Sequence, residues 1–109
     1  MASTLAFTQF VCDQIGGAGN ISYKKMFGEY GLYCDGKFFA LICDDQLFIK
    51  ITDAGLALFP HCETAPPYEG AKPYFLITEL DDRDFLSVLI RNTCAELPFP
   101  KSKKSVADF

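Results

Sequence analysis

The sequence has one histidine, His61, and none of its cysteines lie in a Cys-x-x-Cys spacing. A structural zinc site needs four nitrogen or sulfur ligands at close spacing. The number of cysteines is odd, and reduced thiols often behave as small core hydrophobes. We therefore expect no metal, no cofactor and no disulfide framework. The five cysteines are Cys12, Cys34, Cys43, Cys62 and Cys94.

Long apolar runs and a basic leader are also missing. No window approaches the roughly 18 unbroken apolar residues that a membrane span needs. The first four residues, Met-Ala-Ser-Thr, lack the positive start of a secretory signal. We therefore expect a cytoplasmic protein with no membrane partner.

Positive charge is scarce as well. The formal net charge is −4 at pH 7. Affinity for nucleic acid comes mainly from Lys and Arg side chains that neutralise phosphates, so this balance argues against direct nucleic-acid binding. The one basic cluster, Lys101, Lys103 and Lys104, is typical of a solvated tail. A nucleic-acid arm is the alternative interpretation.

What is present suits one small globular domain. The chain has 109 residues, half of them hydrophobic, which is enough to bury a core. Residues 1–97 carry the apolar patterns, and residues 98–109 are mostly polar after two prolines. We therefore expect a domain over residues 1–97 and a polar C-terminal tail over residues 98–109.

The first half predicts one helix and then strands. Residues 3–15 carry apolar side chains near the helical period, with Ser3 or Thr4 as N-cap, and the glycine-rich residues 16–20 end the helix. Strands are expected over residues 21–26, 30–34, 37–43 and 46–51. Asp35-Gly36 suits a type I′ turn, and Asp44-Asp45 suits a weaker one. Short strands joined by tight turns predict an antiparallel meander.

The second half adds a short helix, a loop, a strand and a long helix. Thr52 or Asp53 caps a helix that ends at Pro60, and residues 61–73 form a loop of unusual length. Residues 73–77 are a strand, and Asp81 caps a helix that runs to about Glu96. The fold class is therefore α+β, with an antiparallel meander flanked by an N-terminal helix, a short middle helix and a long C-terminal helix.

Two strands differ in their apolar pattern. Residues 38–43 are apolar on both faces, so both faces need cover from helices or from another chain. Residues 46–51 alternate more clearly and predict a half-exposed strand, in which Phe48 shares the polar face with Gln46 and Lys50. Because so small a domain has few helices, a homodimer is one way to cover the doubly apolar strand.

Residues 25–36 are the most informative run, because two glycines stand among aromatic side chains before Asp35-Gly36. Through this run the chain resembles the N-terminal domain of the TfoX/Sxy family, regulators of DNA-uptake competence in bacteria. The resemblance covers roughly residues 5–97. The matching positions are residues 25–33, 35–36, 39–41, 46–50 and 66–68, and Tyr74.

The resemblance implies the α+β fold, a role in competence and transcription regulation, and no known catalytic residues. Thr78 departs from the proline that usually ends the family's last strand. Full-length members also have a second helical domain of a DNA-associated type. This chain stops at Phe109, so it is either a one-domain relative or a piece of a longer protein.

The candidate contact residues lie in two segments and one strand. In the first segment, glycines could let a ligand or partner approach the backbone, although a bulge or tight bend is the favoured interpretation. In the loop, an exposed tyrosine could anchor a partner, or it could fold back over the sheet edge. The candidates are Phe27, Gly28, Tyr30 and Gly31, then Pro66, Pro67 and Tyr68, and finally Tyr74.

Three functions remain open from the sequence. The leading one is a non-enzymatic regulatory domain that acts through contacts with an unknown regulatory protein, as a homodimer. The alternative is a small-molecule-binding domain with its ligand between the sheet and residues 61–73, because aromatic residues gather there. The third is an enzyme that uses Cys62 with His61, which lacks visible convergent partners.

Overall fold

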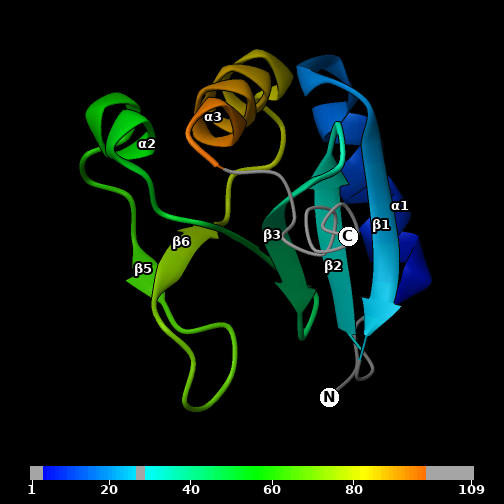
Figure 1. The fold of residues 1–109 in the computed structure, drawn as a ribbon. Helices are drawn as coiled ribbons and strands as arrows, with labels where there is room; N and C mark the ends of the chain where they lie inside the picture. The colour runs from blue at the N-terminus through cyan, green and yellow to red at the C-terminus, as the bar shows by residue number, and fades with distance from the viewer. Residues whose placement is uncertain (1–3, 27–28, 98–109) are drawn as a thin grey trace, which may run out of the picture.

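The computed structural model describes residues 4–26 and 29–97. These residues form six strands and three α-helices, which are arranged in two layers (Figure 1). The candidate residues Phe27 and Gly28 and the predicted tail, residues 98–109, lie outside the described residues. The elements are α1 (Leu5–Ile15), a 3₁₀ turn η1 (Gly16–Ala18), β1 (Ile21–Met26), β2 (Glu29–Cys34), β3 (Lys37–Cys43), β4 (Gln46–Ile49), α2 (Asp53–Leu58), β5 (Thr64–Ala65), β6 (Tyr74–Ile77) and α3 (Arg83–Ala95).

The sheet is antiparallel throughout, with the strand order β1-β2-β3-β4-β6-β5. This confirms the predicted α+β fold and the meander of its first four strands. Asp35 and Gly36 both have positive φ, 53° and 85°, as a type I′ turn requires. Asp44 and Asp45 also have positive φ, so the turn predicted to be weaker has the same left-handed character.

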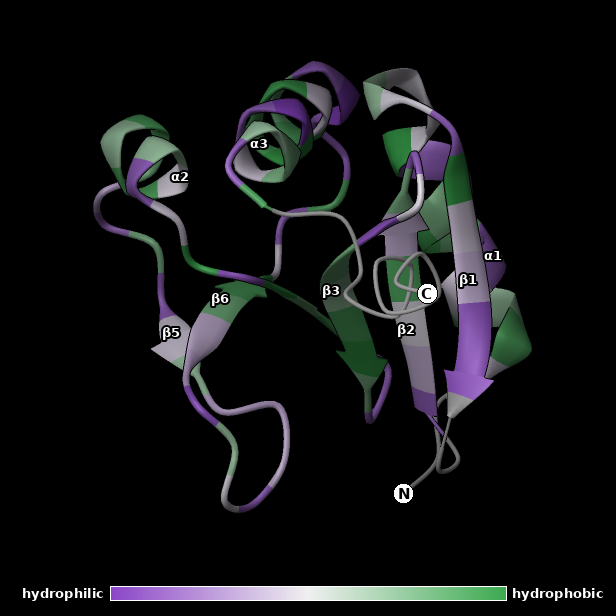
Figure 2. Ribbon diagram, in the orientation of Figure 1, coloured by the Kyte–Doolittle hydropathy of each residue, from purple (hydrophilic) through white to green (hydrophobic). Residues whose placement is uncertain are grey.

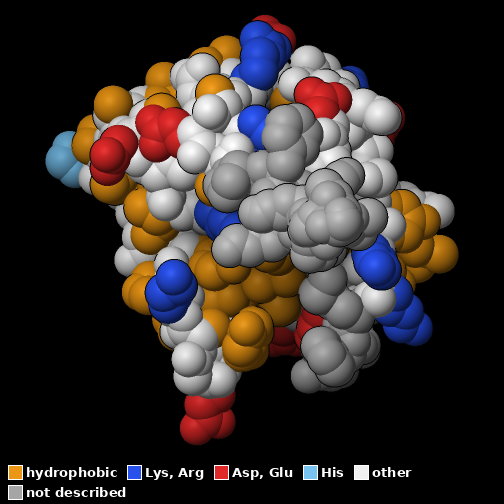
Figure 3. Space-filling view, in the orientation of Figure 1, with side chains coloured by type: hydrophobic (Ala, Val, Ile, Leu, Met, Phe, Trp, Pro, Cys, Tyr) orange, Lys and Arg blue, Asp and Glu red, His pale blue; other side chains and the backbone are white. Residues whose placement is uncertain are grey.

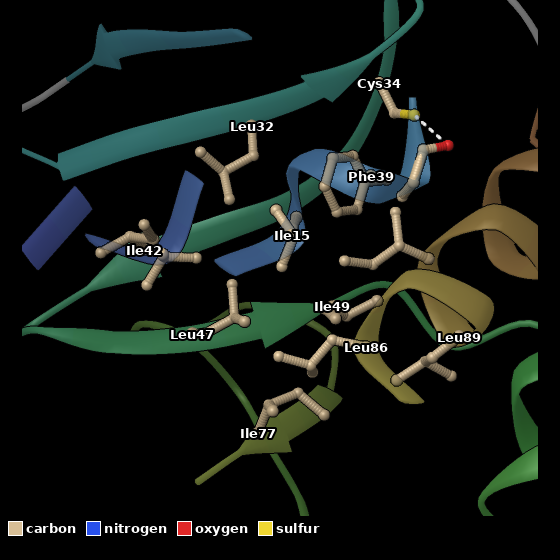
Figure 4. Close-up of a cluster of buried hydrophobic side chains, with 14 of the residues drawn as sticks. Ile15, Leu32, Cys34, Phe39, Ile42, Leu47, Ile49, Ile77, Leu86 and Leu89 are labelled. Carbon is tan, nitrogen blue, oxygen red and sulfur yellow. Dashed lines mark hydrogen bonds between the residues drawn. The ribbon is translucent and has the colours of Figure 1, made fainter. Parts of the chain in front are cut away.

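All three described α-helices lie on one face of the sheet, and the main core fills the space between them (Figure 1). Figure 4 shows Leu32, Phe39, Ile49 and Leu86 pointing into this core from β2, β3, β4 and α3. Figure 2 shows β3 as one of the most hydrophobic stretches of the ribbon. Burial of apolar area, at about 25 cal/mol per Å², makes this layer the main source of stability.

A bulge in the pairing of β2 and β3 lets two successive residues of β3 face the main core. Leu32 pairs with Ala40 and Tyr33 pairs with Phe38, so Phe39 has no partner in β2. An extra residue breaks the strict alternation of side chains. As a result Phe39 and its neighbour Ala40 both belong to the main core, where both are fully buried. Gly31, where the sequence suggested a bulge, pairs regularly one residue before the irregularity.

Side-chain caps begin each α-helix. Thr4 accepts a hydrogen bond from the Phe7 amide, and Thr52 accepts one from the Gly55 amide. For α3 the cap is Asp82, which accepts from the Phe85 amide at 3.1 Å, so the prediction of Asp81 is wrong by one residue. The sequence Asp81-Asp82 offers two equivalent capping side chains, and backbone geometry decides between them.

Two other predictions change in the second half of the sheet. The loop over residues 61–73 contains a two-residue strand, β5, which pairs with β6 at the sheet edge. The half-exposed strand predicted at residues 46–51 is shorter, and Leu47, Phe48 and Ile49 are all buried. That prediction is wrong because Phe48 enters a second apolar cluster on the opposite face.

Candidate functional site

The face of the sheet opposite the helices carries a second apolar cluster. Leu41, Cys43 and Phe48 are its buried members, with exposed fractions of 7%, 4% and 4%. We call this cluster the second face. Its partly buried members are Phe38, Ala65, Tyr74 and Leu76. None of its seven residues is charged, and Figure 3 shows hydrophobic side chains in the middle of this side of the molecule.

Alternation along neighbouring strands produces this surface. Leu41 pairs with Phe48 across β3 and β4, and Phe48 pairs with Leu76 across β4 and β6. Directly opposed residues of an antiparallel pair point to the same side of the sheet. The three side chains therefore form a continuous apolar row across three strands. The doubly apolar character predicted for residues 38–43 is confirmed, because this strand contributes to both clusters.

Aromatic rings and a lysine border one end of the second face. The Tyr33 and Phe38 ring centroids are 5.5 Å apart. Lys50 Nζ lies 4.7 Å from the Phe38 ring centroid, at a cation–π distance. The backbone amide of Lys50 also donates to the Phe39 carbonyl, which continues the β3–β4 pairing beyond β4. The ammonium group is thereby positioned at the margin of the face.

A hollow opens beside that lysine, between the end of β4 and the start of β6. Its volume is about 360 Å³. Burial lowers the pKa of Lys50, and the charge of Lys72 lowers it further. Two ammonium groups therefore share one site in an acidic protein. The hollow is lined by Lys50, Ile51, Lys72, Pro73, Tyr74 and Leu97.

The structure separates the candidate residues of the aromatic run. Tyr30 is buried in the main core, where its ring meets Tyr23 edge-on at 5.7 Å. Gly31 is buried within the sheet and pairs with Lys24 and Leu41 on its two sides. Tyr30 therefore packs with the helix layer, on one side of the sheet. Gly31 lies beside Leu41, which belongs to the second face on the other side.

The loop candidates are also distributed. Pro67 is buried and Pro66 is exposed. Tyr68 is 61% exposed. Burial raises the pKa of Tyr74, and the nearby Tyr68 raises it further. Tyr74 is half-buried and belongs to both the second face and the hollow. Among the described candidates, Tyr74 is the side chain that belongs to this site.

Sequence reasoning found part of the site. Residues 38–43 were apolar on both faces, and the pattern of residues 46–51 placed Lys50 on the same strand face as Phe48. Leu76 and Lys72 gave no signal, since neither stands in a recognisable motif. Their contribution depends on β6 pairing with β4 across a 24-residue gap, which short-range patterns do not encode.

The thiols show no sign of nucleophilic activation. Burial raises the pKa of Cys62, and Glu63 raises it further. The Cys62 sulfur lies 3.3 Å from the Glu63 carbonyl oxygen and 3.7 Å from that of Leu76, so its single S–H group has two acceptors within reach. His61 is exposed. Catalytic cysteines have a lowered pKa, so the raised pKa of the Cys62 thiol is the opposite of what a nucleophile needs. No group of three potential metal ligands occurs within residues 4–26 and 29–97.

We expect three thiols to resist alkylation in the folded protein. Burial raises the pKa of Cys43 to about 11, and burial with the nearby Cys34 raises that of Cys94 to about 12. At pH 8 iodoacetamide should label these two roughly a hundredfold or more slowly than in the unfolded chain, because only thiolate reacts. Buried Cys34 should follow them. Peptide mass spectrometry after timed labelling measures the rates.

Denatured protein provides the control for that experiment. All five cysteines should react at similar rates in about 6 M guanidinium chloride, which exposes every thiol. Half-buried Cys12 and Cys62 should react before the others in the folded protein. Fast labelling of Cys94 in the folded state would contradict the packing described for α3 and β2.

The fold and site define a small α+β domain with one helix-covered sheet face and one apolar face. The comparisons agree: the TfoX N-terminal domain family matches residues 13–97. The chain is also 38% identical over 106 residues to an "Uncharacterized 12.7 kDa protein in trpE 5'region" from Spirochaeta aurantia, covering 96% of this chain and 92% of that protein. The chain belongs to the TfoX N-terminal domain family, a family of regulatory domains. Among the described residues, no helix has the length and apolar character to cross a membrane.

Proposed function

We propose that this domain is a non-enzymatic regulatory module that acts through protein contacts and forms a homodimer through its second face. The observation that carries the proposal is the apolar row Leu41, Phe48 and Leu76, which lies opposite the three described helices. Leu41 and Phe48 are almost fully buried within one chain, whereas Phe38, Tyr74 and Leu76 are only partly buried. Partly exposed apolar side chains that lie together on a small domain mark a site of protein contact. Membership of a regulatory family supports the same conclusion.

Charge favours a second copy as the occupant of this face. Two copies that each carry a net charge of −4 repel one another over most of their surfaces. The seven residues of the second face carry no charge, and the lysines Lys50 and Lys72 border it. In a twofold interface the same patch meets itself, so apolar centres can pack together where repulsion is least.

In the cell, we propose that the dimer works in the bacterial cytoplasm and contributes to competence or transcription control through another regulatory protein. The family supports this role. The net negative charge argues against direct contact with DNA phosphates. Tyr68, exposed at the loop, is available for contact with a second protein.

Light scattering across a dilution series tests the dimer. We expect a mass twice the 12.1 kDa of one chain at about 100 µM, with dissociation on dilution. Added salt should strengthen the dimer, because it screens the repulsion between acidic copies. A mass of one chain at every concentration would refute the homodimer.

A second candidate function is small-molecule binding, which the hollow beside Tyr74 favours. It lies where the sheet meets the end of the loop over residues 61–73, and its volume of about 360 Å³ falls within the range of ligand pockets. Binding to the folded state raises the melting temperature. A thermal-shift screen of nucleotides and common metabolites tests this function, and a uniformly negative screen would count against it.

A further inference from the structure

We propose that the hollow lined by Lys50 and Lys72 binds a small organic anion, an oxyanion group carried on an apolar body. The proposal rests on the second candidate function and gives its ligand class and its contact residues. The hollow shares Tyr74 with the second face, so it lies beside the proposed dimer interface. Neither the sequence motifs nor the family match assigns a ligand to these residues.

The first argument is the balance of charge at the hollow. The six lining residues include two lysines and no carboxylate. Among the described residues, no ion pair joins Lys50 or Lys72 to an Asp or Glu side chain. Two like charges held near each other repel, and an anion between them relieves that repulsion. Acidic residues outnumber basic ones in this chain by 14 to 10, which makes a lysine pair with no carboxylate among the lining residues notable.

The second argument is that one ammonium group is already positioned. Lys50 Nζ lies 4.7 Å from the centroid of the Phe38 ring, and Lys50 is half-buried. A fixed charge loses less conformational entropy on binding than a mobile one. Lys72 is exposed, so it can adjust to the ligand from the loop side. A bound anion would also reverse the lowered pKa of Lys50, because an opposite charge favours the ammonium form.

The third argument concerns the other walls of the hollow. Ile51, Pro73 and Leu97 are apolar, and Tyr74 adds an aromatic ring with one hydroxyl group. A volume of about 360 Å³ lies near the lower end of ligand pockets. These walls suit a ligand with one ring or a short chain next to its charged group. Inorganic phosphate alone would leave the apolar walls unused.

NMR titration of the full chain tests the proposal with three defined probes. Phenyl phosphate and phenylacetate carry the two common oxyanions on the same ring, and 2-phenylethanol is their neutral counterpart. Both anions, up to about 10 mM, should shift the backbone amides of Ile51 and Tyr74 in a saturable way. The neutral probe should bind at least about fivefold more weakly. The ratio of the two anion affinities identifies the preferred headgroup.

Charge variants locate the site. Lys72→Gln, an exposed substitution that should not disturb folding, should weaken anion binding about fivefold or more, and Lys72→Arg should retain it. Lys24→Gln removes the same charge from exposed β1, three strands away from β4, and should change the affinity less than about twofold. This pair separates a local contact from a change in net charge.

Each other outcome overturns the proposal in a recognisable way. Equal binding of the neutral and anionic probes would leave a small-molecule site but remove its charge preference. Equal loss in Lys24→Gln and Lys72→Gln would show a general charge effect without a site. No saturable shift with either anion would reject the anion site, while the thermal-shift screen would still judge the broader ligand-binding function.

Discussion

Leu76→Asp should convert the homodimer into monomers. Leu76 is half-buried on the second face and pairs with Phe48 in the neighbouring strand. In the twofold interface, each copy would bring an unpaired carboxylate into an apolar contact, which typically costs several kcal/mol. The dissociation constant should rise by about a hundredfold or more. Sedimentation or light scattering across a concentration series measures this change.

Val88→Asp is the matched control for that variant. Val88 is 40% exposed on α3, which covers the other side of the sheet. It adds the same charge but should leave the dissociation constant within about threefold of the parent protein. Circular dichroism should show both variants folded. If folded Leu76→Asp remained dimeric, the interface would have to lie elsewhere.

Phe39→Ala should cause the largest loss of stability among single core truncations of β3. Its ring is fully buried in the main core, and the residue occupies the bulge that lets two successive side chains face the helices. Removing a buried phenyl ring combines lost burial with a cavity, typically about 3–5 kcal/mol. Urea denaturation should show a lower midpoint with little change in slope.

Phe10→Ala removes the same ring from a different environment. Phe10 is 44% exposed on α1. Because less of its apolar area is buried, its loss should cost less than about 1.5 kcal/mol. Both variants should be measured at one protein concentration, since dimerisation contributes to apparent stability. Equal losses in the two variants would contradict the placement of Phe39 at the centre of the core.

Local chemistry explains why many elements were predictable. Asp35-Gly36 supplies the two positive φ angles of a tight hairpin, and Thr52 supplies a cap oxygen one residue before its helix. These features act over a few residues, so they can be recognised without the fold. Asp44-Asp45 was harder, because two aspartates adopt positive φ less readily than a pair with glycine.

The site was less predictable, because it depends on residues far apart in the chain. Lys50 and Phe48 were correctly placed on one strand face, but Phe48 appeared exposed until β6 brought Leu76 beside it. Tyr30 and Tyr74 both looked like contact residues, yet they lie on opposite faces of the sheet. A sequence pattern indicates which side chains share one face of a strand, but it does not show which other element covers that face.

The α+β class, the hairpins and the helix positions could be predicted from the sequence, because periodicity, turn residues and caps act locally. The family followed from the resemblance carried by residues 25–36. Tertiary structure alone decided that β6 inserts between β4 and β5, that Phe39 and Ala40 face the same core, and that Lys50 and Lys72 meet at one hollow. The physical reason is that strand order, bulges and charge proximity depend on long-range packing. The apolar second face also depends on tertiary structure, since β3, β4 and β6 must pair in register to bring its side chains together.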